Sequence, residues 1–201
     1  MTTIKLGITG GIGSGKSVVS RILRLMDVPV YDCDSQSKYL TEHNNVIRTQ
    51  LIDLLGNNVY FSNGKLNKSF LASYVFSDSR HTAQINQIIH PIVKVDFENW
   101  AINQNPDILI IGMESAILFE AKLEKTIDKI LFVQAPFNLR IQRTMERDDL
   151  SFEQVKMRIR AQMDDDEKMK RSHFVVINDD EHSLLSQVQN ILNGLKGLSQ
   201  Y

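Results

Sequence analysis

One stretch near the start of the chain has the residue types and spacing of a phosphate-binding loop. It consists of Gly10-Gly11-Ile12-Gly13-Ser14-Gly15-Lys16-Ser17 and fits the pattern G-x-x-x-x-G-K-[ST] without a mismatch. Because glycine has no side chain, successive backbone N–H groups of such a loop can turn inward and surround phosphate oxygens. Lys16 can reach the outer phosphates of a nucleotide, and the Ser17 hydroxyl can bind Mg²⁺. The sequence therefore predicts a nucleotide site that uses the residues from Gly11 to Ser17.

The segments on either side of this loop agree with the motif. Residues 4–9 have the composition of a short buried strand, and the apolar residues after the loop recur at helical spacing. The glycines therefore lie at a strand-to-helix turn, where free N–H groups and the positive end of the helix dipole face the anion. The rival dinucleotide motif G-x-G-x-x-G is absent, because Lys16 stands where its third glycine would be.

Two acids follow the next predicted strand, which spans residues 28–31. Ligands of open α/β sheets bind at the carboxyl ends of the strands, so Asp32 and Asp34 are expected near the phosphate loop. Either carboxylate can take a proton from a hydroxyl group or hold Mg²⁺ through water. For Asp32 we favour a functional role. For Asp34 such a role and the capping of the next helix both stay open.

Arginines gather on a predicted helix that begins after Pro136. Arg140, Arg143 and Arg147 are spaced by three and four residues, which places them on roughly one face. A capping box over residues 151–154 begins a second helix, which carries Arg158 and Arg160. These arginines form either a solvated face with acidic partners, or a mobile lid that brings guanidinium groups to transferring phosphates. Spacing alone does not decide between the two.

The remaining pattern predicts strands separated by helices. Buried strands are expected over residues 107–113, 129–133 and 174–177, and the acidic run Asp164–Glu167 is expected to be solvated. Residues 35–103 are mostly helical, with a turn near 59–65 and an interruption at His90-Pro91, where His90 is expected to be extended. A lone histidine is more often structural than catalytic. This long insertion is the natural place for a second substrate.

These elements predict one α/β domain over residues 1–201, with a doubly wound parallel sheet of about five strands. Its parts are the helical insertion of about 35–103 and a lid of about 138–165. The net charge of -1 gives no electrostatic basis for binding nucleic acid or an anionic membrane. No secretory signal is expected, and the apolar run of residues 108–113 is far shorter than the about 20 residues that span a bilayer. The single cysteine, Cys33, fits a cytoplasmic protein. The protein is expected to be a monomer or a weak homo-oligomer.

Two classes of phosphate-loop protein compete for this pattern. A guanine-nucleotide switch needs an N-K-x-D motif after a strand, and the sequence has none. The string Asp53-Leu54-Leu55-Gly56 matches the switch pattern D-x-x-G, but it ends a predicted helix rather than a strand. A small-molecule kinase explains the acid pair, the helical insertion and the arginine-rich lid. The sequence therefore favours a kinase.

Nearly the whole chain resembles the dephospho-coenzyme A kinase family. The resemblance rests on the phosphate loop with its leading Ile8-Thr9, and on Asp32-Cys33-Asp34, His90-Pro91 and Leu118-Phe119-Glu120. It continues with Arg143 and Arg147 before Asp148-Asp149, with Arg160-Ala161-Gln162, and with Val176-Ile177-Asn178. Such kinases transfer the γ-phosphoryl group of ATP to the ribose 3′-hydroxyl of dephospho-coenzyme A, which completes coenzyme A biosynthesis. Another small-molecule phosphate-loop kinase is the alternative.

The resemblance also implies roles for particular residues. Asp32 would be the base, the insertion would hold the acceptor, and ATP with Mg²⁺ would occupy the phosphate loop. Catalytic candidates are Asp32, Lys16, Arg140 and Arg143; nucleotide candidates beyond the loop are Arg147 and Asn178; acceptor candidates are Thr9, Asp32, Asp34, His90, Glu120 and Arg160. Two positions depart from the family pattern: Ala116 replaces a proline after the third strand, and Asp180 replaces a glycine after Asn178-Asp179.

Overall fold

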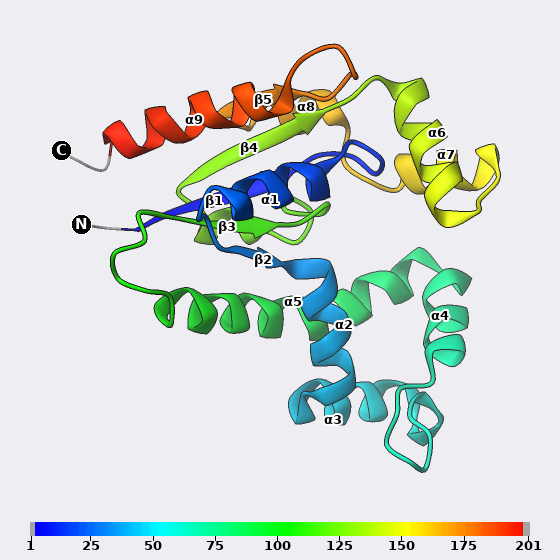
Figure 1. Cartoon of the computed structure of the whole chain (residues 1–201). Helices are drawn as coiled ribbons and strands as arrows, with labels where there is room; N and C mark the ends of the chain where they lie inside the picture. The colour runs from blue at the N-terminus through cyan, green and yellow to red at the C-terminus, as the bar shows by residue number, and fades with distance from the viewer. Residues whose placement is uncertain (1–2, 199–201) are drawn as a thin grey trace. The chain divides into compact units, whose positions relative to one another are not determined.

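Five parallel β-strands form one sheet (Figure 1). In this computed structural model, which describes residues 3–198, the strands lie in the order β2-β3-β1-β4-β5. The central strand β1 pairs with β3, where Ile8 lies beside Glu114, and with β4, where Thr9 lies beside Phe132. The strands are β1 (Ile4–Thr9), β2 (Val30–Asp32), β3 (Ile110–Glu114), β4 (Lys129–Gln134) and β5 (Phe174–Ile177). The parallel five-stranded sheet predicted from the sequence is confirmed.

Apolar side chains of the strands pack against two helices to form the main core. Leu6 and Ile8 of β1 are fully buried, as are Leu23 of α1 and Leu195 of α9. Burial of one such side chain contributes about 1.5–3 kcal/mol. This apolar layer therefore stabilises the central strand, whose carboxyl end carries the phosphate loop. The helices around the sheet are α1 (Lys16–Leu25), α6 (Phe137–Asp148), α7 (Phe152–Arg160), α8 (Asp165–Lys170) and α9 (Leu184–Leu198), with a 3-10 turn η2 (Leu123–Thr126).

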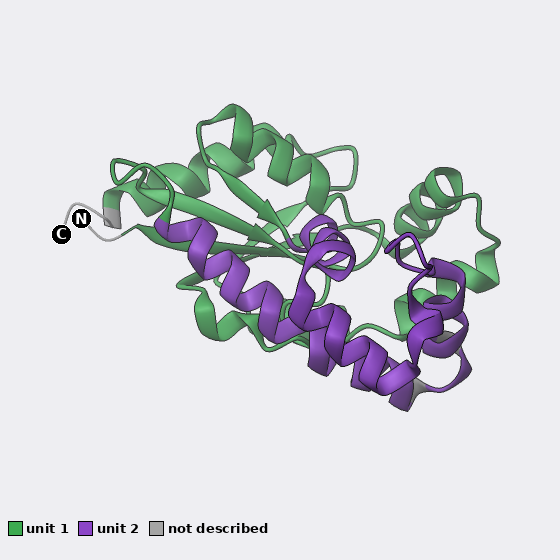
Figure 2. Cartoon of the chain, turned by 90° about the horizontal axis from the view of Figure 1, so that it is seen from below, with its two compact units in different colours: residues 1–32, 103–201 green, residues 33–102 purple. Residues whose placement is uncertain are grey.

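The chain forms two compact units (Figure 2). Unit 1 contains the residues up to Asp32 and from Asn103 onward, and it includes the sheet; unit 2 is Cys33–Ile102. Unit 2 spans nearly the same residues as the expected insertion, whose role in holding an acceptor stays a prediction. Its elements are α2 (Cys33–His43), α3 (Asn45–Leu55), η1 (Asn57–Val59), α4 (Lys68–Ser77) and α5 (Ser79–Ile102).

In unit 2, helix α5 packs against α2, α3 and α4. The side chains of Asn44 and Asn67 cap α3 and α4 by accepting backbone N–H groups of their first turns. An antiparallel bridge between Tyr60 and Leu66 confirms the predicted turn. The guanidinium of Arg48 lies over the Tyr60 ring at 4.1 Å from its centroid. Local polar contacts of this kind fix the connections, while packing fixes the helices.

Helix α5 corrects one prediction. The sequence indicated an interruption at His90-Pro91, but α5 continues through Pro91 as a single helix. A proline inside a helix removes one N–H donor and costs about 3 kcal/mol. Ile85 before it and Phe97 after it are both buried, so packing on both sides outweighs that cost. His90 is therefore helical rather than extended.

Two other local expectations change. Helix α2 begins at Cys33, so Asp34 lies in its first turn rather than at the preceding cap position. The acidic run is not simply solvated: the Asp164 side chain caps α8 by accepting two backbone N–H groups, and Asp165 forms an ion pair with Arg140. The second change arises from side-chain pairing that a run of acidic residues does not reveal. The predicted capping box at Ser151 is confirmed.

Candidate active site

The phosphate loop, residues 10–17, connects β1 to α1 at the carboxyl end of the central strand (Figure 1). Gly13 and Gly15 have φ angles of 75° and 92°, in the left-handed region that favours glycine. A Cβ atom on Gly10 would lie 2.5 Å from the carbonyl oxygen of Val133, and one on Gly11 would collide with the guanidinium of Arg140. The glycines are therefore required by both backbone angle and space.

The loop presents hydrogen-bond donors that nothing in the described part of the chain uses. The backbone N–H groups of Gly13, Gly15 and Ser17 have no hydrogen-bond partner there. Two hydroxyl groups, those of Thr9 and Ser14, are also buried without a partner among the described residues. Unpaired buried polar groups are unfavourable, so this donor set fits an anion with several oxygen atoms.

The side chain of Lys16 is buried along the loop. Its Nζ donates to the carbonyl oxygens of Gly10 and Gly11 at 3.0 and 3.1 Å. These bonds place a positive charge inside the ring of backbone groups, where it attracts phosphate. Ser17, in contrast, is exposed at the first turn of α1, so its hydroxyl is accessible to a metal ion.

A pair of carboxylates lies at the carboxyl ends of β2 and β3. Asp32 is the last residue of β2, and the register places it beside Glu114, the last residue of β3. Neighbouring residues of parallel strands project from the same face of the sheet, so the two carboxylates share one face. Glu114 in turn lies beside Ile8 of β1, two residues before the phosphate loop. Both acids are partly buried.

Two side chains bind the backbone of one loop residue, Ile12. Arg140 of α6 donates from Nε to the Ile12 carbonyl oxygen at 2.9 Å, and Gln162 accepts the Ile12 N–H at 2.9 Å. Arg140 is only 4% exposed and forms an ion pair with Asp165. Burial lowers the pKa of Arg140 from its ordinary value, but the guanidinium stays charged at neutral pH. Arg140 therefore does not lie on a solvated face.

Asn178 lies behind the phosphate loop, directly after β5. Its Nδ2 donates to the carbonyl oxygen of Ser14 at 2.7 Å, and the same group fills the space where Gly15 lacks a side chain. Arg143 donates to the Asn178 carbonyl oxygen at 3.2 Å and forms an ion pair with Asp180. Asp180 has a φ of 68°, so it adopts the backbone angle that a glycine would supply at this departure from the family pattern. The loop keeps its turn and gains a partner for Arg143.

A second ionic group fixes the connection between α7 and α8. Lys168 is fully buried, and its Nζ lies 2.9 Å from Glu120 and 3.0 Å from the carbonyl oxygen of Ala116. Glu120 also accepts the Met163 N–H at 2.8 Å. Burial raises the pKa of Glu120, but the hydrogen bonds from Lys168 and Met163 outweigh it and lower the pKa overall. Glu120 is thus engaged in holding this segment.

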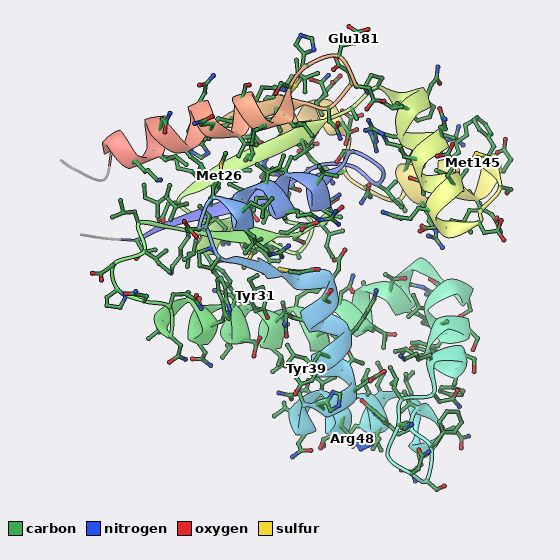
Figure 3. All side chains as sticks on the ribbon, in the orientation of Figure 1. Met26, Tyr31, Tyr39, Arg48, Met145 and Glu181 are labelled. Atoms are coloured by element: carbon green, nitrogen blue, oxygen red, sulfur yellow. The ribbon has the colours of Figure 1, made fainter. Side chains whose placement is uncertain are left out.

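At the far end of the α6–α7 pair, two arginines share one carboxylate. Arg147 and Arg158 both pair with Asp148, at 2.7 and 3.2 Å. Arg160 is exposed. Met145 (Figure 3) and Phe152 line a cavity of about 340 Å³ between α6 and α7.

Comparisons with known proteins agree on one family. The dephospho-CoA kinase family model matches residues 4–183. The chain belongs to the dephospho-CoA kinase family. A dephospho-CoA kinase from Bacteroides fragilis is 51% identical over 190 residues, which cover 94% of this chain and 91% of that protein. A solved structure from Thermus thermophilus has a TM-score of 0.80 at 32% identity, covering 96% of this chain and 98% of the other.

A dephospho-CoA kinase structure from Campylobacter jejuni, at 21% identity and a TM-score of 0.68, covers 99% of this chain and 98% of its own and shows the same fold. The protein is therefore a kinase with the phosphate-loop kinase fold. In the described part of this kinase, no helix is long and apolar enough to cross a membrane. The same residues contain no group of three or more His, Cys, Asp or Glu side chains that could hold a metal ion.

Unit 2 of the kinase carries two of the acceptor candidates and one large cavity. Asp34 lies in the first turn of α2, and burial lowers the pKa of His90 on α5, so that histidine is neutral at pH 7. The cavity, of about 570 Å³, combines apolar and basic side chains. Its lining residues include Lys38, Lys68, Leu66, Leu71, Val75 and Ile89.

Sequence reasoning missed three residues that the structure brings into this network. Glu114 was part of the segment after a strand, and only the strand register places it beside Asp32. Lys168 and Gln162 contact partners far away in the chain, and Gln162 lies 150 positions from Ile12. For Gln162 the one signal was its place in the motif Arg160-Ala161-Gln162.

Proposed function

We propose that this kinase transfers the γ-phosphoryl group of ATP to the ribose 3′-hydroxyl of dephospho-CoA, the last step of CoA biosynthesis, in the cytoplasm. Family membership supports the reaction. The observation that carries nucleotide binding is the set of unpartnered donors in the described phosphate loop, at Gly13, Gly15 and Ser17, with the Lys16 ammonium beside them. Such a set matches the oxygen atoms of a triphosphate.

Mg²⁺ is the metal that we propose for this site, with the Ser17 hydroxyl as its protein ligand. Mg²⁺ is held in kinases by one or two protein oxygens together with phosphates and water, so an exposed hydroxyl at the loop is sufficient. When bound, the ion neutralises negative charge that develops on the phosphates during transfer. Asp32 and Glu114 are the carboxylates best placed on the sheet to contact its water ligands.

Phosphoryl transfer requires mainly positioning and electrostatic stabilisation. We assign to Asp32 the role of base, which accepts the proton of the acceptor hydroxyl and contributes about 10²–10⁴-fold. Lys16 stabilises the charge on the moving phosphoryl group, and Arg140 and Arg143 add positive charge beside the loop. Arg147, on the outer turn of α6–α7, reaches the nucleotide if this pair of helices closes as a lid.

Unit 2 is the proposed place of the acceptor. Its cavity offers Lys38 and Lys68 for phosphate groups, and Leu71 and Val75 for the less polar arm of dephospho-CoA. Lys68 pairs with Glu42 at 2.7 Å at this surface, and an incoming phosphate can compete for the ammonium. The other proposed acceptor contacts are Thr9, Asp34, His90, Glu120 and Arg160.

A test of this function compares acceptors with the purified protein, ATP and Mg²⁺. ADP formation is measured with dephospho-CoA, adenosine, AMP, shikimate and gluconate, each alone. We expect turnover with dephospho-CoA, and loss of that turnover in Asp32→Asn. Phosphorylation of another acceptor without any of dephospho-CoA would move the protein to a different small-molecule kinase activity.

A further inference from the structure

The two peptide units that meet at Ile12 are each held by a side chain from one distant segment. Its carbonyl oxygen accepts from Arg140 and its N–H donates to Gln162, both at 2.9 Å. Ile12 lies between Gly11 and Gly13, and glycines rotate more freely than any other residue. Each of these two bonds fixes the direction of a different peptide unit: Gln162 that of Gly11–Ile12, and Arg140 that of Ile12–Gly13.

Three other carbonyl groups of the phosphate loop are held by side chains of unit 1 as well. Lys16 binds those of Gly10 and Gly11, and Asn178 binds that of Ser14. Gln162 is the one of these holders whose bond fixes a donor, the Ile12 N–H, rather than a carbonyl. These bonds hold the loop in a defined shape, and the direction of the Ile12 N–H depends on residue 162.

The position of Gln162 is itself fixed by its neighbours. The next residue, Met163, donates its N–H to Glu120, which is paired with the buried Lys168. On the same short connection, Asp165 is paired with Arg140. Gln162 is only partly exposed. The backbone on which Gln162 lies is therefore anchored by Glu120 and Arg140, and the Gln162 side chain reaches Ile12 from this fixed position.

We infer that Gln162 is a positioning residue for nucleotide binding: by accepting the Ile12 N–H it holds the phosphate loop in the conformation that receives the triphosphate. This inference rests on the proposed function only in taking the loop as the nucleotide site. Pre-organised donors bind an anion more strongly because no freedom is lost when it arrives. Loss of the bond should therefore weaken binding of the nucleotide and leave binding of the phosphoryl acceptor unaffected.

The experiment compares two substitutions at this position with a matched control. Gln162→Ala removes the acceptor of the Ile12 N–H, whereas Gln162→Glu keeps an acceptor of the same length and adds a negative charge. Gln142→Ala is the control, because Gln142 is an exposed glutamine of α6 whose side chain donates to Glu146, one turn along the helix. Each protein is measured for ADP and ATP binding by direct titration, for KM of both substrates and for thermal unfolding.

Gln162→Ala should raise the Kd of ADP and the KM of ATP by about five- to tenfold, as expected for one neutral hydrogen bond. The KM of the acceptor should stay within twofold. Gln162→Glu should unfold at the wild-type temperature. Because it keeps an acceptor for the Ile12 N–H, it should bind ATP more tightly than Gln162→Ala at high salt, where its added charge is screened. The amide resonance of Ile12 should shift in both variants and stay in place in Gln142→Ala.

Three outcomes would overturn the inference. Unchanged nucleotide binding with a lowered unfolding temperature in Gln162→Ala would make Gln162 a structural contact only. Tighter ADP binding in that variant would mean that Gln162 competes with the nucleotide. Equal nucleotide binding by Gln162→Ala and Gln162→Glu at high salt would mean that an acceptor for the Ile12 N–H does not matter for binding. Because the ADP titration needs no acceptor, it gives its answer even if dephospho-CoA proves not to be the substrate.

Discussion

The two ends of the segment α6–α8 are built from similar residues but held in different ways. We call Arg140, Gln162, Asp165 and Lys168 the inner end, and residues 145–160 the outer end. Arg140 and Lys168 are 4% and 0% exposed, and the inner end is bonded to the phosphate loop and to Glu120. At the outer end, Arg147 and Arg158 are 61% and 49% exposed and share Asp148. One segment thus combines an inner end that is fixed by buried contacts with an outer end that carries exposed ion pairs.

This difference is what a lid would need in order to position groups at its base and still move at its tip. The inner end keeps the phosphate loop in shape whatever the outer end does, because its bonds reach Ile12 rather than the outer helices. The ion pairs of Arg147 and Arg158 at the outer end are exposed, and such pairs contribute about 0–1 kcal/mol. We therefore expect substitutions at or beside the inner end to affect both stability and catalysis, and those of the exposed arginines at the outer end to leave stability nearly unchanged.

The largest loss of turnover should come from the loop that the inner end holds. Lys16→Met removes the ammonium and keeps a stem of similar length along the buried path, so the fold should survive. Removal of one pre-organised charge-stabilising group costs about 10²–10³-fold in kcat. Steady-state kinetics and thermal unfolding measure the two effects separately. A variant with near-normal turnover would exclude the proposed role of Lys16 in phosphoryl transfer.

At the inner end itself, Arg140→Ala should lower both stability and turnover. It leaves Asp165 without its partner and the Ile12 carbonyl without its donor. Breaking a buried ion pair on one side costs about 3–5 kcal/mol, and because Asp165 is 34% exposed we expect the lower figure, about 3 kcal/mol. Chemical denaturation measures it. Asp165→Asn is the matched control, since it keeps Arg140 on Ile12 and should retain much more of the turnover.

The contrast between the two ends also marks the limit of sequence reasoning. The phosphate loop, the parallel strands and the Ser151 capping box follow patterns of neighbouring residues, and all three were predicted. Arg140 and Arg147 belong to the same helical spacing, yet one is buried and the other exposed. Only tertiary packing separates them, so the sequence could not choose between a solvated face and a lid.

The residues that were missed share one property: their partners lie far away in the chain. Gln162 and Lys168 are ordinary polar residues until Ile12 and Glu120 are brought next to them. The break expected at Pro91 failed for a related reason, because a local penalty was outweighed by packing within unit 2. Local rules thus predicted elements, and non-local pairing decided which polar residues serve the site.

The Glu120–Lys168 pair should make the inner end sensitive to acid. The pKa of Glu120 is lowered from its ordinary value of 4.5 in the folded protein, so the folded state binds fewer protons there than the unfolded chain. The stability that this group contributes is therefore complete above about pH 4.5 and is lost as pH falls through the lowered value. Glu120→Gln should cost about 1–2 kcal/mol at pH 7 and less at pH 3. Chemical denaturation at both pH values measures the difference, and a constant gap would contradict this role of the pair.

At the outer end the expected effect on stability is the smallest. Arg147 is 61% exposed, and its pKa is raised mainly by the hydrogen bond to Asp148, so Arg147→Ala should change the free energy of unfolding by less than about 1 kcal/mol. Arg158→Ala is the matched control, because it removes the other arginine that pairs with Asp148. If the outer end closes over the nucleotide through Arg147, only Arg147→Ala should also lower turnover, by about tenfold for one lost hydrogen bond between charged groups.

Protease cleavage with ATP and acceptor bound supplies a second measurement: residues 145–160 should be protected in the wild type and less so in Arg147→Ala. Equal turnover in the two variants would mean that Arg147 forms only an ordinary surface ion pair with Asp148. This segment would then contribute to catalysis through its inner end alone.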